Sequence, residues 1–256
     1  NLPVVWIDHH DVEAPKQKWI NYYNPFHNDK TNEPVSYMCY KIANKKEDLW
    51  LALIGCISDA LIPDFYEEFL KKYPELGKNN PKSAFDILFK AEIGKIARVL
   101  DFSLKDSMTN VVKMQKFMIE AKSPYDVLEE NEKTKQILSK YYQLNKKYEY
   151  LLEQIRKLEK DKIIFFTYGG EFSISANIAN RIKYEFPESY VIIGYKKPNE
   201  GFYNFSLRGD HVREITLKAI ENIEKSSAGG HEKAIGARIP EDKIELFKEN
   251  IQRLIK

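Results

Sequence analysis

The stretch Val4-Val5-Trp6-Ile7-Asp8-His9-His10 sets four apolar residues directly before a carboxylate and two imidazoles. A short apolar run that stops at metal-binding side chains predicts a buried strand that delivers ligands to a crevice of an α/β fold. Successive residues of a strand point to opposite faces, so His9 and His10 face one ion only where the strand has ended. Asp8, His9 and His10 are donors that suit Mn²⁺ or another catalytic divalent cation. A surface or capping role is the alternative for this triplet.

The composition is that of a globular protein without a strong overall charge. Hydrophobic residues make up 43% of the chain and charged residues 30%, which excludes a disordered protein. The formal net charge is only +2, so nucleic-acid binding requires a local basic patch. Cys39 and Cys56 lie outside any CxxC spacing and are expected to be buried free thiols in a reducing cytoplasm. No apolar stretch is long enough to cross a bilayer and no signal peptide is evident, so we expect a cytoplasmic protein without a membrane partner.

Residues 1–105 predict an α/β segment in which helices predominate. After the strand that ends at Ile7, a polar and turn-rich loop is expected over residues 11–34. Asp48 is a suitable cap for the apolar helix that follows it. The other helical segments share apolar periodicity: residues 35–43, and the stretches of 64–105 that are broken at Pro74, Gly77 and Pro81.

Residues 106–160 contain little Gly or Pro, and their apolar residues recur at helical spacing among many Lys and Glu. This pattern predicts a long, solvated connecting helix or helix pair, with too few heptads for a coiled coil. Strands and helices then alternate over residues 161–256, which predicts a second, compact α/β domain. Its expected elements are strands at 163–166, 190–194, 202–207 and 237–239, helices at 173–184, 211–225 and from 241 onward, and a glycine loop at 226–231.

Three further groups of residues are candidates for chemistry. Asp59 follows an apolar helix so closely that, if buried and ionised, it needs a metal or an arginine as partner; the alternative is that it caps the next helix. Gly229 and Gly230, before His231, let the backbone approach a ligand and turn N–H groups toward phosphate oxygens, although paired glycines are also common in turns. Ser206-Leu207-Arg208-Gly209 follows a strand and offers a guanidinium that can hold a phosphate through two hydrogen bonds.

Together these motifs resemble the DHH phosphoesterase superfamily, and in particular its archaeal RecJ-like single-strand nucleases. The similarity runs through essentially the whole chain. Besides Asp8-His9-His10, it rests on Tyr23-Asn24-Pro25, Gly55-Cys56-Ile57-Ser58-Asp59, Glu92-Ile93-Gly94-Lys95-Ile96-Ala97-Arg98, Ser206-Leu207-Arg208-Gly209 and Gly229-Gly230-His231-Glu232-Lys233-Ala234. The resemblance implies part of a DHH catalytic domain over residues 1–105, with a parallel sheet that lacks its N-terminal strands. A helical connector over 106–160 and a smaller α/β DHH-associated domain over 161–256 would follow.

The resemblance also implies roles for individual residues. His9 and Asp59 would be catalytic ligands of a divalent metal, with Asp8 as a further ligand, and His10 would lie near the bridging water and the scissile phosphate. The nucleic-acid backbone or a terminal nucleotide would be held by Ser206, Arg208, Gly229, Gly230 and His231. The implied reaction is the hydrolysis of a phosphodiester bond with two Mn²⁺ or Mg²⁺ ions.

The ligand set is smaller than the pattern of this superfamily requires. Its members carry an Asp-x-Asp motif and a further aspartate that complete a two-metal site, and these do not precede Asp8 here. His9, Asp59 and His10 are too few donors for two cations that each take about four to six ligands. We expect a separate polypeptide to supply the missing aspartates in a hetero-oligomer. A fragment of an ordinary nuclease and a non-catalytic relative are the alternatives.

Three functions are compatible with these patterns. The first is a Mn²⁺- or Mg²⁺-dependent exonuclease subunit for single-stranded DNA or RNA, inactive without its partner, with replication or repair proteins as further partners. The others are a phosphodiesterase for oligonucleotides or cyclic dinucleotides, similar to nano-RNases, and a non-catalytic replication or repair scaffold. Basic side chains of the second domain would line a groove, and aromatic side chains would stack bases unless they pack in the core: Lys183, Lys196, Lys197, Arg208, Arg213 and Arg238, with Tyr195, Phe202 and Tyr203.

Overall fold

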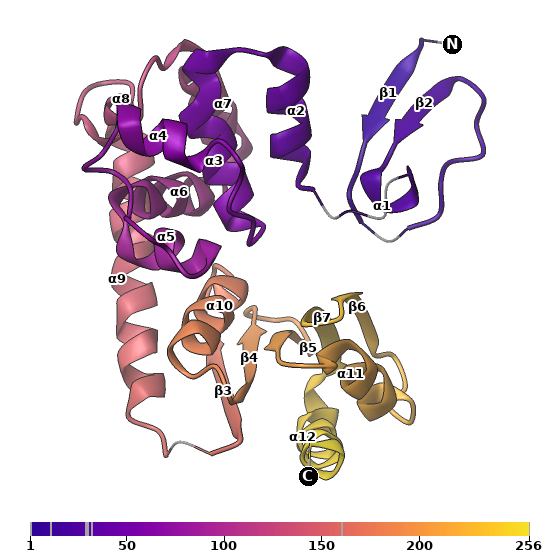
Figure 1. Cartoon of the computed structure of the whole chain (residues 1–256). Coiled ribbons are helices and arrows are strands. Elements are labelled where there is room, and N and C mark those ends of the chain that lie inside the picture. The colour runs from indigo at the N-terminus through magenta and orange to yellow at the C-terminus, as the bar shows by residue number, and fades with distance from the viewer. Residues whose placement is uncertain (1, 11, 29–30, 32, 160, 256) are drawn as a thin grey trace. The chain divides into compact units, whose positions relative to one another are not determined.

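The computed structural model describes every residue except 1, 11, 29, 30, 32, 160 and 256 (Figure 1). The chain forms two compact units, Asn1–Gln143 and Leu144–Lys256. Helices and parallel or mixed sheets build them, which confirms the α/β fold that the sequence predicts. Residues 106–160, expected to form a connector, are divided between the two units. Each described helix is too short or too polar to span a bilayer.

The N-terminal strand lies where the sequence places it. β1 (Val4–Ile7) ends directly before Asp8. A second strand, β2 (Ile20–Tyr23), and a short helix, α1 (Pro25–Asn28), lie inside the stretch expected to be a loop, so that expectation was wrong. β2 runs parallel to β1, with Val4 opposite Ile20. The sequence did not reveal β2 because its four residues carry no clear alternation, and a local pattern does not state that they pair with β1.

Helices make up the rest of the first unit: α2 (Val35–Ala43), α3 (Leu49–Ser58), α4 (Tyr66–Lys72), α5 (Ala84–Lys90), α6 (Glu92–Ser103), α7 (Met108–Glu120), α8 (Tyr125–Leu128) and the beginning of α9 (Lys135–Arg156). The apolar helix α3 is central, because it contacts α2, α4, α5 and α6. Its Leu53, Cys56 and Ile57 side chains are fully buried. Cys39 on α2 is exposed, so the expectation that both cysteines are buried was wrong for Cys39. Asp48 occupies the N-cap position, as predicted, but makes no capping hydrogen bond, since its backbone is already close to helical (φ −85°, ψ 5°).

The long helix expected between the two halves of the chain is α9. One of its sides is packed and the rest is exposed to solvent. Tyr148, Leu152 and Ile155 are each 1% exposed, whereas Tyr142 and Tyr150 on other sides of the helix are exposed. The apolar periodicity of this segment therefore marks a packed face rather than a helix surrounded by solvent.

The described residues of the second unit form the end of α9, a five-stranded sheet with the order β3-β4-β5-β7-β6, and the helices α10, α11 and α12. β3 and β4 are parallel and the other neighbours are antiparallel. The expected glycine loop is a strand, β6, because backbone pairing with β7 compensates for the low strand propensity of glycine. The elements are β3 (Ile163–Gly169), α10 (Ser175–Glu185), β4 (Tyr190–Lys196), β5 (Phe202–Arg208), α11 (Val212–Ile220), β6 (Ser227–His231), β7 (Ala234–Pro240), a 3₁₀ turn (Glu241–Lys243) and α12 (Ile244–Leu254).

The two faces of this sheet differ in what covers them. Alternate residues such as Leu207, Ile235 and Ile239 join Phe247 and Ile251 of α12 in a fully buried core on one face. On the other face α10 packs against β4 and β5, and the side chains of β7 and β6 are exposed. We call the following residues of that second face, assigned by strand alternation and register, the open face: Phe202, Asn204, Ser206, Arg208, Ala234, Gly236, Arg238, Ser227, Gly229 and His231.

Candidate functional site

Asp8 organises the turn that carries the two histidines. The backbone N–H of Asp8 donates to the carbonyl oxygen of Tyr23 (3.0 Å), which extends the pairing of β1 with β2 by one residue. One carboxylate oxygen of Asp8 accepts the backbone N–H groups of His9 (2.8 Å) and His10 (3.2 Å) and lies 2.7 Å from Nδ1 of His10. The two imidazole rings lie edge to face, with centroids 4.5 Å apart. The carboxylate therefore fixes the backbone of both histidines after the strand has ended.

The charge of Asp8 is favoured by this arrangement. Partial burial raises the pKa of the Asp8 carboxyl, but the hydrogen bonds from His10 and His9 outweigh burial, and the pKa lies below its ordinary value. Asp8 is thus ionised at neutral pH, and its Oδ1 is engaged inside the turn. We interpret it as a positioning residue for His9 and His10.

Asn24 holds the same turn from the other side, and its role did not emerge from the sequence. Its amide nitrogen donates to the carbonyl oxygen of His10 (2.8 Å) and to the hydroxyl of Tyr22 (2.9 Å), and its carbonyl oxygen accepts the N–H of Phe26 (3.0 Å). The side chain is 1% exposed, so these bonds satisfy a buried amide. The sequence offers Tyr23-Asn24-Pro25 only as part of a family resemblance, because the hydrogen bond between Asn24 and His10 requires the β1–β2 pairing.

Asp59 lies at the C-terminal end of α3 and is exposed. Its backbone N–H donates to the carbonyl oxygens of Gly55 and Cys56, so it ends α3; it does not cap the next helix, as the alternative proposed. Because the carboxylate is exposed, burial does not force a charged partner on it. Within the described residues, no three or more His, Cys, Asp or Glu side chains are grouped so that they could hold a metal ion. The structure therefore does not join Asp59 with Asp8 and His9 into a metal centre.

On the second unit, the register of the sheet brings together four of the five residues expected to bind substrate. Ser206 lies opposite Gly236, which lies opposite Gly229 on β6. Arg208 lies opposite Ala234, which lies opposite His231. One face of β5, β7 and β6 thus carries Ser206, Arg208, Gly229 and His231. Ser206 and Gly229 are separated by about 10 Å across β7, and so are Arg208 and His231.

Gly229 and Gly230 differ in whether the fold has room for a larger side chain. Gly230 has φ +149°, and a Cβ there would lie 2.5 Å from the carbonyl oxygen of Ala234, so the hairpin itself requires a glycine. A Cβ at Gly229 would meet nothing within 4 Å. Gly236, which the sequence did not single out, borders Gly229 on the open face and makes a backbone surface without side chains. Only the register reveals it, because the two residues are not adjacent in sequence.

Arg208 is a cationic side chain that is largely withdrawn from solvent. Its Nε donates to Oδ1 of Asn180 on α10 (2.6 Å), and its Nη1 donates to the carbonyl oxygen of Leu207 (2.8 Å). No carboxylate forms an ion pair with it among the residues that the structure describes. Burial lowers the pKa of Arg208 to about 10, which leaves it charged at neutral pH. A desolvated guanidinium with neutral partners favours an anion.

Residues 152–256 match the family model of the DHHA1 domain. This part of the chain is therefore similar to DHHA1 domains. The structure of the whole chain is similar to RecJ from Thermus thermophilus in complex with Mn²⁺, with TM-score 0.61, 16% identity, and coverage of 98% of this chain and 41% of that chain. The same protein in complex with Mg²⁺ gives TM-score 0.56 and 14% identity, with 86% of this chain and 36% of that chain covered. The DHH domain of a member of the S1p family of ribosomal proteins gives TM-score 0.58 and 17% identity, with 97% and 62% covered.

These similarities confirm the DHH superfamily and a RecJ-like fold. At such identities the likeness to solved structures shows the fold alone, and the chain spans about two fifths of the length of RecJ. No curated protein sequence matches the chain. Members of the DHH superfamily are phosphoesterases, and the similar RecJ structures hold Mg²⁺ and Mn²⁺. The narrower likeness to archaeal nucleases stays a prediction.

The described residues do not fit the two divalent ions that the superfamily implies. Oδ1 of Asp8 is already occupied by three contacts to His9 and His10. Asp59 is not grouped with them, and the described part of the chain offers no other cluster of three donors. We therefore derive no chemical step through a metal from these residues alone.

Only some of the other candidate side chains of the second unit belong to its open face. Tyr195 is 5% exposed and donates to the carbonyl oxygen of Gly170, so it is a core residue. Tyr203 points to the opposite face and stacks on Phe205. Lys196 and Lys197 form ion pairs with Glu241 and Glu200, and Lys183 donates to the backbone carbonyls of Pro187 and Ser189. Of the basic candidates, Arg208 and Arg238 belong to the open face.

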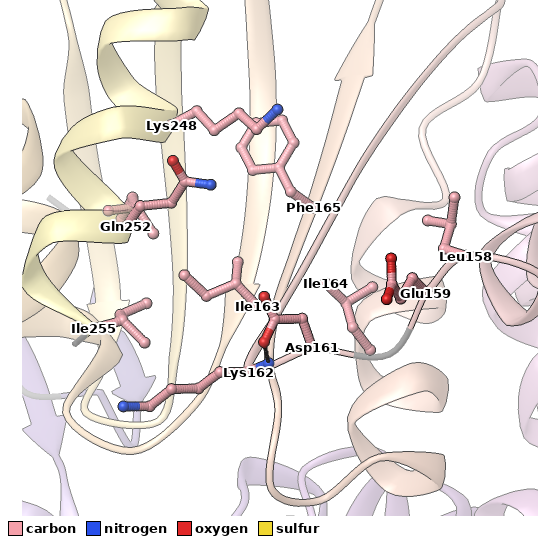
Figure 2. A pocket seen from close by; sticks show the side chains of 11 residues that line it. Leu158, Glu159, Asp161, Lys162, Ile163, Ile164, Phe165, Lys248, Gln252 and Ile255 are labelled. Atoms are coloured by element: carbon pink, nitrogen blue, oxygen red, sulfur yellow. Dashed lines mark hydrogen bonds between the residues drawn. The ribbon is translucent and has the colours of Figure 1, made fainter.

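A cavity of 570 Å³ between β3 and α12 lies at the other edge of the same sheet (Figure 2). Its lining combines apolar side chains such as Ile163 and Ile255 with charged ones, of which Lys248 and Asp161 have contacts within the lining. Nζ of Lys248 lies 5.5 Å from the ring centre of Phe165, and the N–H of Lys162 donates to the carboxylate of Asp161 (2.6 Å). Its position at the β3 edge separates it from the open face, which ends at β6.

Proposed function

We propose that this chain is the substrate-holding part of a phosphodiesterase that hydrolyses single-stranded DNA or RNA with Mn²⁺ or Mg²⁺. The observation that carries the proposal is Arg208, a withdrawn guanidinium bonded only to Asn180 and a backbone carbonyl among the described residues. A phosphodiester would supply the counter-charge that this side chain lacks. Because the net charge of the chain is only +2, such a local site is a better explanation of nucleic-acid binding than an overall field.

The surroundings of Arg208 suit a phosphodiester backbone. Ser206 presents a hydroxyl that is held by Ser175 at 3.0 Å, and His231 adds an exposed imidazole on the same face. Gly229 leaves room for a strand to approach the backbone of β6. Hydrogen bonds to phosphate oxygens hold a strand without reading its sequence, which agrees with an enzyme that acts on many sequences.

The hydrolytic part of the proposal rests on the first unit. His9, His10 and Asp59 would contribute to a divalent-metal site, with Asp8 ordering the turn, and the remaining carboxylates would come from outside the described residues. We propose that a separate polypeptide with an Asp-x-Asp motif after a strand supplies them. Support comes from β1 and β2, a two-stranded parallel sheet with exposed Val5 (72%), Trp6 (42%) and Trp19 (46%), since parallel sheets are normally covered on both faces.

The test combines the chain, the candidate partner polypeptide and Mn²⁺ with an end-labelled single-stranded oligonucleotide. We expect little hydrolysis by the chain alone, cutting by the mixture, and loss of cutting with His9→Ala. Arg253→Ala, which removes an exposed arginine of α12, is the matched control that should cut like wild type. Activity that survives His9→Ala would refute the assignment of this turn to the catalytic centre.

The same assay separates the two other candidate functions. Turnover of dinucleotides without turnover of longer strands would indicate an oligonucleotide or cyclic-dinucleotide phosphodiesterase. A stable complex that binds no Mn²⁺ and cuts neither would indicate a replication or repair scaffold. We place the activity in the cytoplasm, because the described Cys39 and Cys56 are both free thiols.

A further inference from the structure

The exposed guanidinium of Arg238 lies over the half-buried ring of Phe202, at the far end of the open face from Arg208. The guanidinium carbon of Arg238 lies 4.1 Å from the ring centre of Phe202. Arg238 is exposed, and none of the ion pairs found among the described residues includes it. The planar guanidinium is therefore held against one aromatic ring while its outer side faces solvent.

This stack shares a face and a strand with the proposed phosphate site. Phe202, Asn204, Ser206 and Arg208 are alternate residues of β5, and Arg238 on β7 lies directly opposite Asn204. At the usual rise along a strand, four residues separate the stack from Arg208 by about 13 Å. A single strand with stacked bases rises about 3.4 Å per nucleotide, so this distance corresponds to about four nucleotides. An extended strand would cover it with fewer.

We propose that the Phe202–Arg238 stack is a second contact station for single-stranded nucleic acid, on which a base stacks while Arg208 holds a phosphate a few nucleotides away. The proposal rests on the proposed function and names its substrate class, strands longer than a dinucleotide. A base has a π-face whatever its identity, so the outer side of the guanidinium would accept any base and add its positive charge near the backbone. Gly236 and Gly229 lie between the two stations and carry no side chain, so the strand could approach the backbone there.

The test measures binding of fluorescein-labelled single strands of two and eight nucleotides to the full chain by fluorescence anisotropy, without Mn²⁺ so that hydrolysis does not interfere. We expect wild type to favour the eight-nucleotide strand by about tenfold or more, and Arg238→Ala to remove most of this preference. Arg238→Lys keeps the charge without the planar group and should recover only a small part of it. Arg253→Ala loses the same charge on α12 and should keep the wild-type preference.

The outcomes separate this inference from the proposed function. If wild type binds neither strand, the proposed function itself is wrong. If Arg208→Gln weakens binding of both strands while Arg238→Ala keeps the wild-type length preference, the phosphate site stands and the second station is refuted. Full recovery in Arg238→Lys would also refute it, since a point charge would then explain the effect without stacking. Circular dichroism of each variant should match wild type, because Arg238 is an exposed side chain.

Discussion

The substitution Gly229→Ala tests whether a ligand approaches the backbone of β6. A Cβ at this position would have no neighbour within 4 Å, and Gly229 is not among the glycines with positive φ. The substitution should therefore change the free energy of unfolding by no more than about 0.5 kcal/mol. A larger loss of ligand affinity would then result from contact between the ligand and the added methyl group, since the fold itself is unchanged.

The expected effect on binding is large by comparison. A hydrogen bond to a charged phosphate oxygen contributes about 1.5–3 kcal/mol, and a methyl group that holds the strand away from the β6 backbone would forfeit much of one such bond. We expect at least about a tenfold weaker Kd for a labelled single strand, measured by fluorescence anisotropy on the full chain. Thermal unfolding of the same samples should show an unchanged Tm.

Two other glycines provide the controls. A Cβ at Gly201 also meets nothing within 4 Å, so Gly201→Ala should keep both wild-type stability and wild-type binding. Gly230→Ala would place Cβ 2.5 Å from the carbonyl oxygen of Ala234 at a positive φ and should cost about 1–3 kcal/mol of stability. If Gly229→Ala binds the strand as tightly as Gly201→Ala, no ligand approaches β6 and this reasoning is refuted.

Three further predictions concern charge and burial. Arg208→Gln should reduce the slope of log Kd against log salt by about 0.7, as for one lost phosphate contact on a single strand, and an unchanged slope would contradict the phosphate site. Because the pKa of Asp8 is lowered in the folded chain, its carboxylate stabilises the fold above its unfolded pKa of 3.8 and loses this effect as the pH falls through the folded value. The Tm difference between wild type and Asp8→Asn should therefore be largest near neutral pH and disappear in acid; a difference that grows in acid would contradict it. Burial raises the pKa of the Cys56 thiol to about 11, so iodoacetamide at pH 8 should label the exposed Cys39 first, and mass spectrometry would show equal labelling if this were wrong.

Local sequence patterns were sufficient wherever a single element decides the structure. The apolar run before Asp8 predicted β1, and apolar periodicity predicted helix α2 with the bounds found in the structure. Patterns failed where an element exists only because of its partner. β2 and β6 carry weak strand signals. Both form through pairing with β1 and β7, strands that the sequence predicts without stating which segments pair with them.

The candidate site divides in the same way. The sequence by itself determined the chemical groups: a carboxylate and two imidazoles after a strand, an arginine after another, and a glycine pair before a histidine. It also explained why Asp8 and the histidines come together, since they are neighbours in one turn.

Only the tertiary structure decided which of these groups share a surface. Ser206, Gly236 and Gly229 form one row because the registers of β5 with β7 and of β7 with β6 align them, and a shift of one residue would turn each side chain to the opposite face. The burial of Leu207 and Ile235 against α12 holds that register. Arg208 is withdrawn from solvent and bonded to Asn180 because α10 packs over β5, and a contact between such distant residues is a property of packing that no local pattern contains.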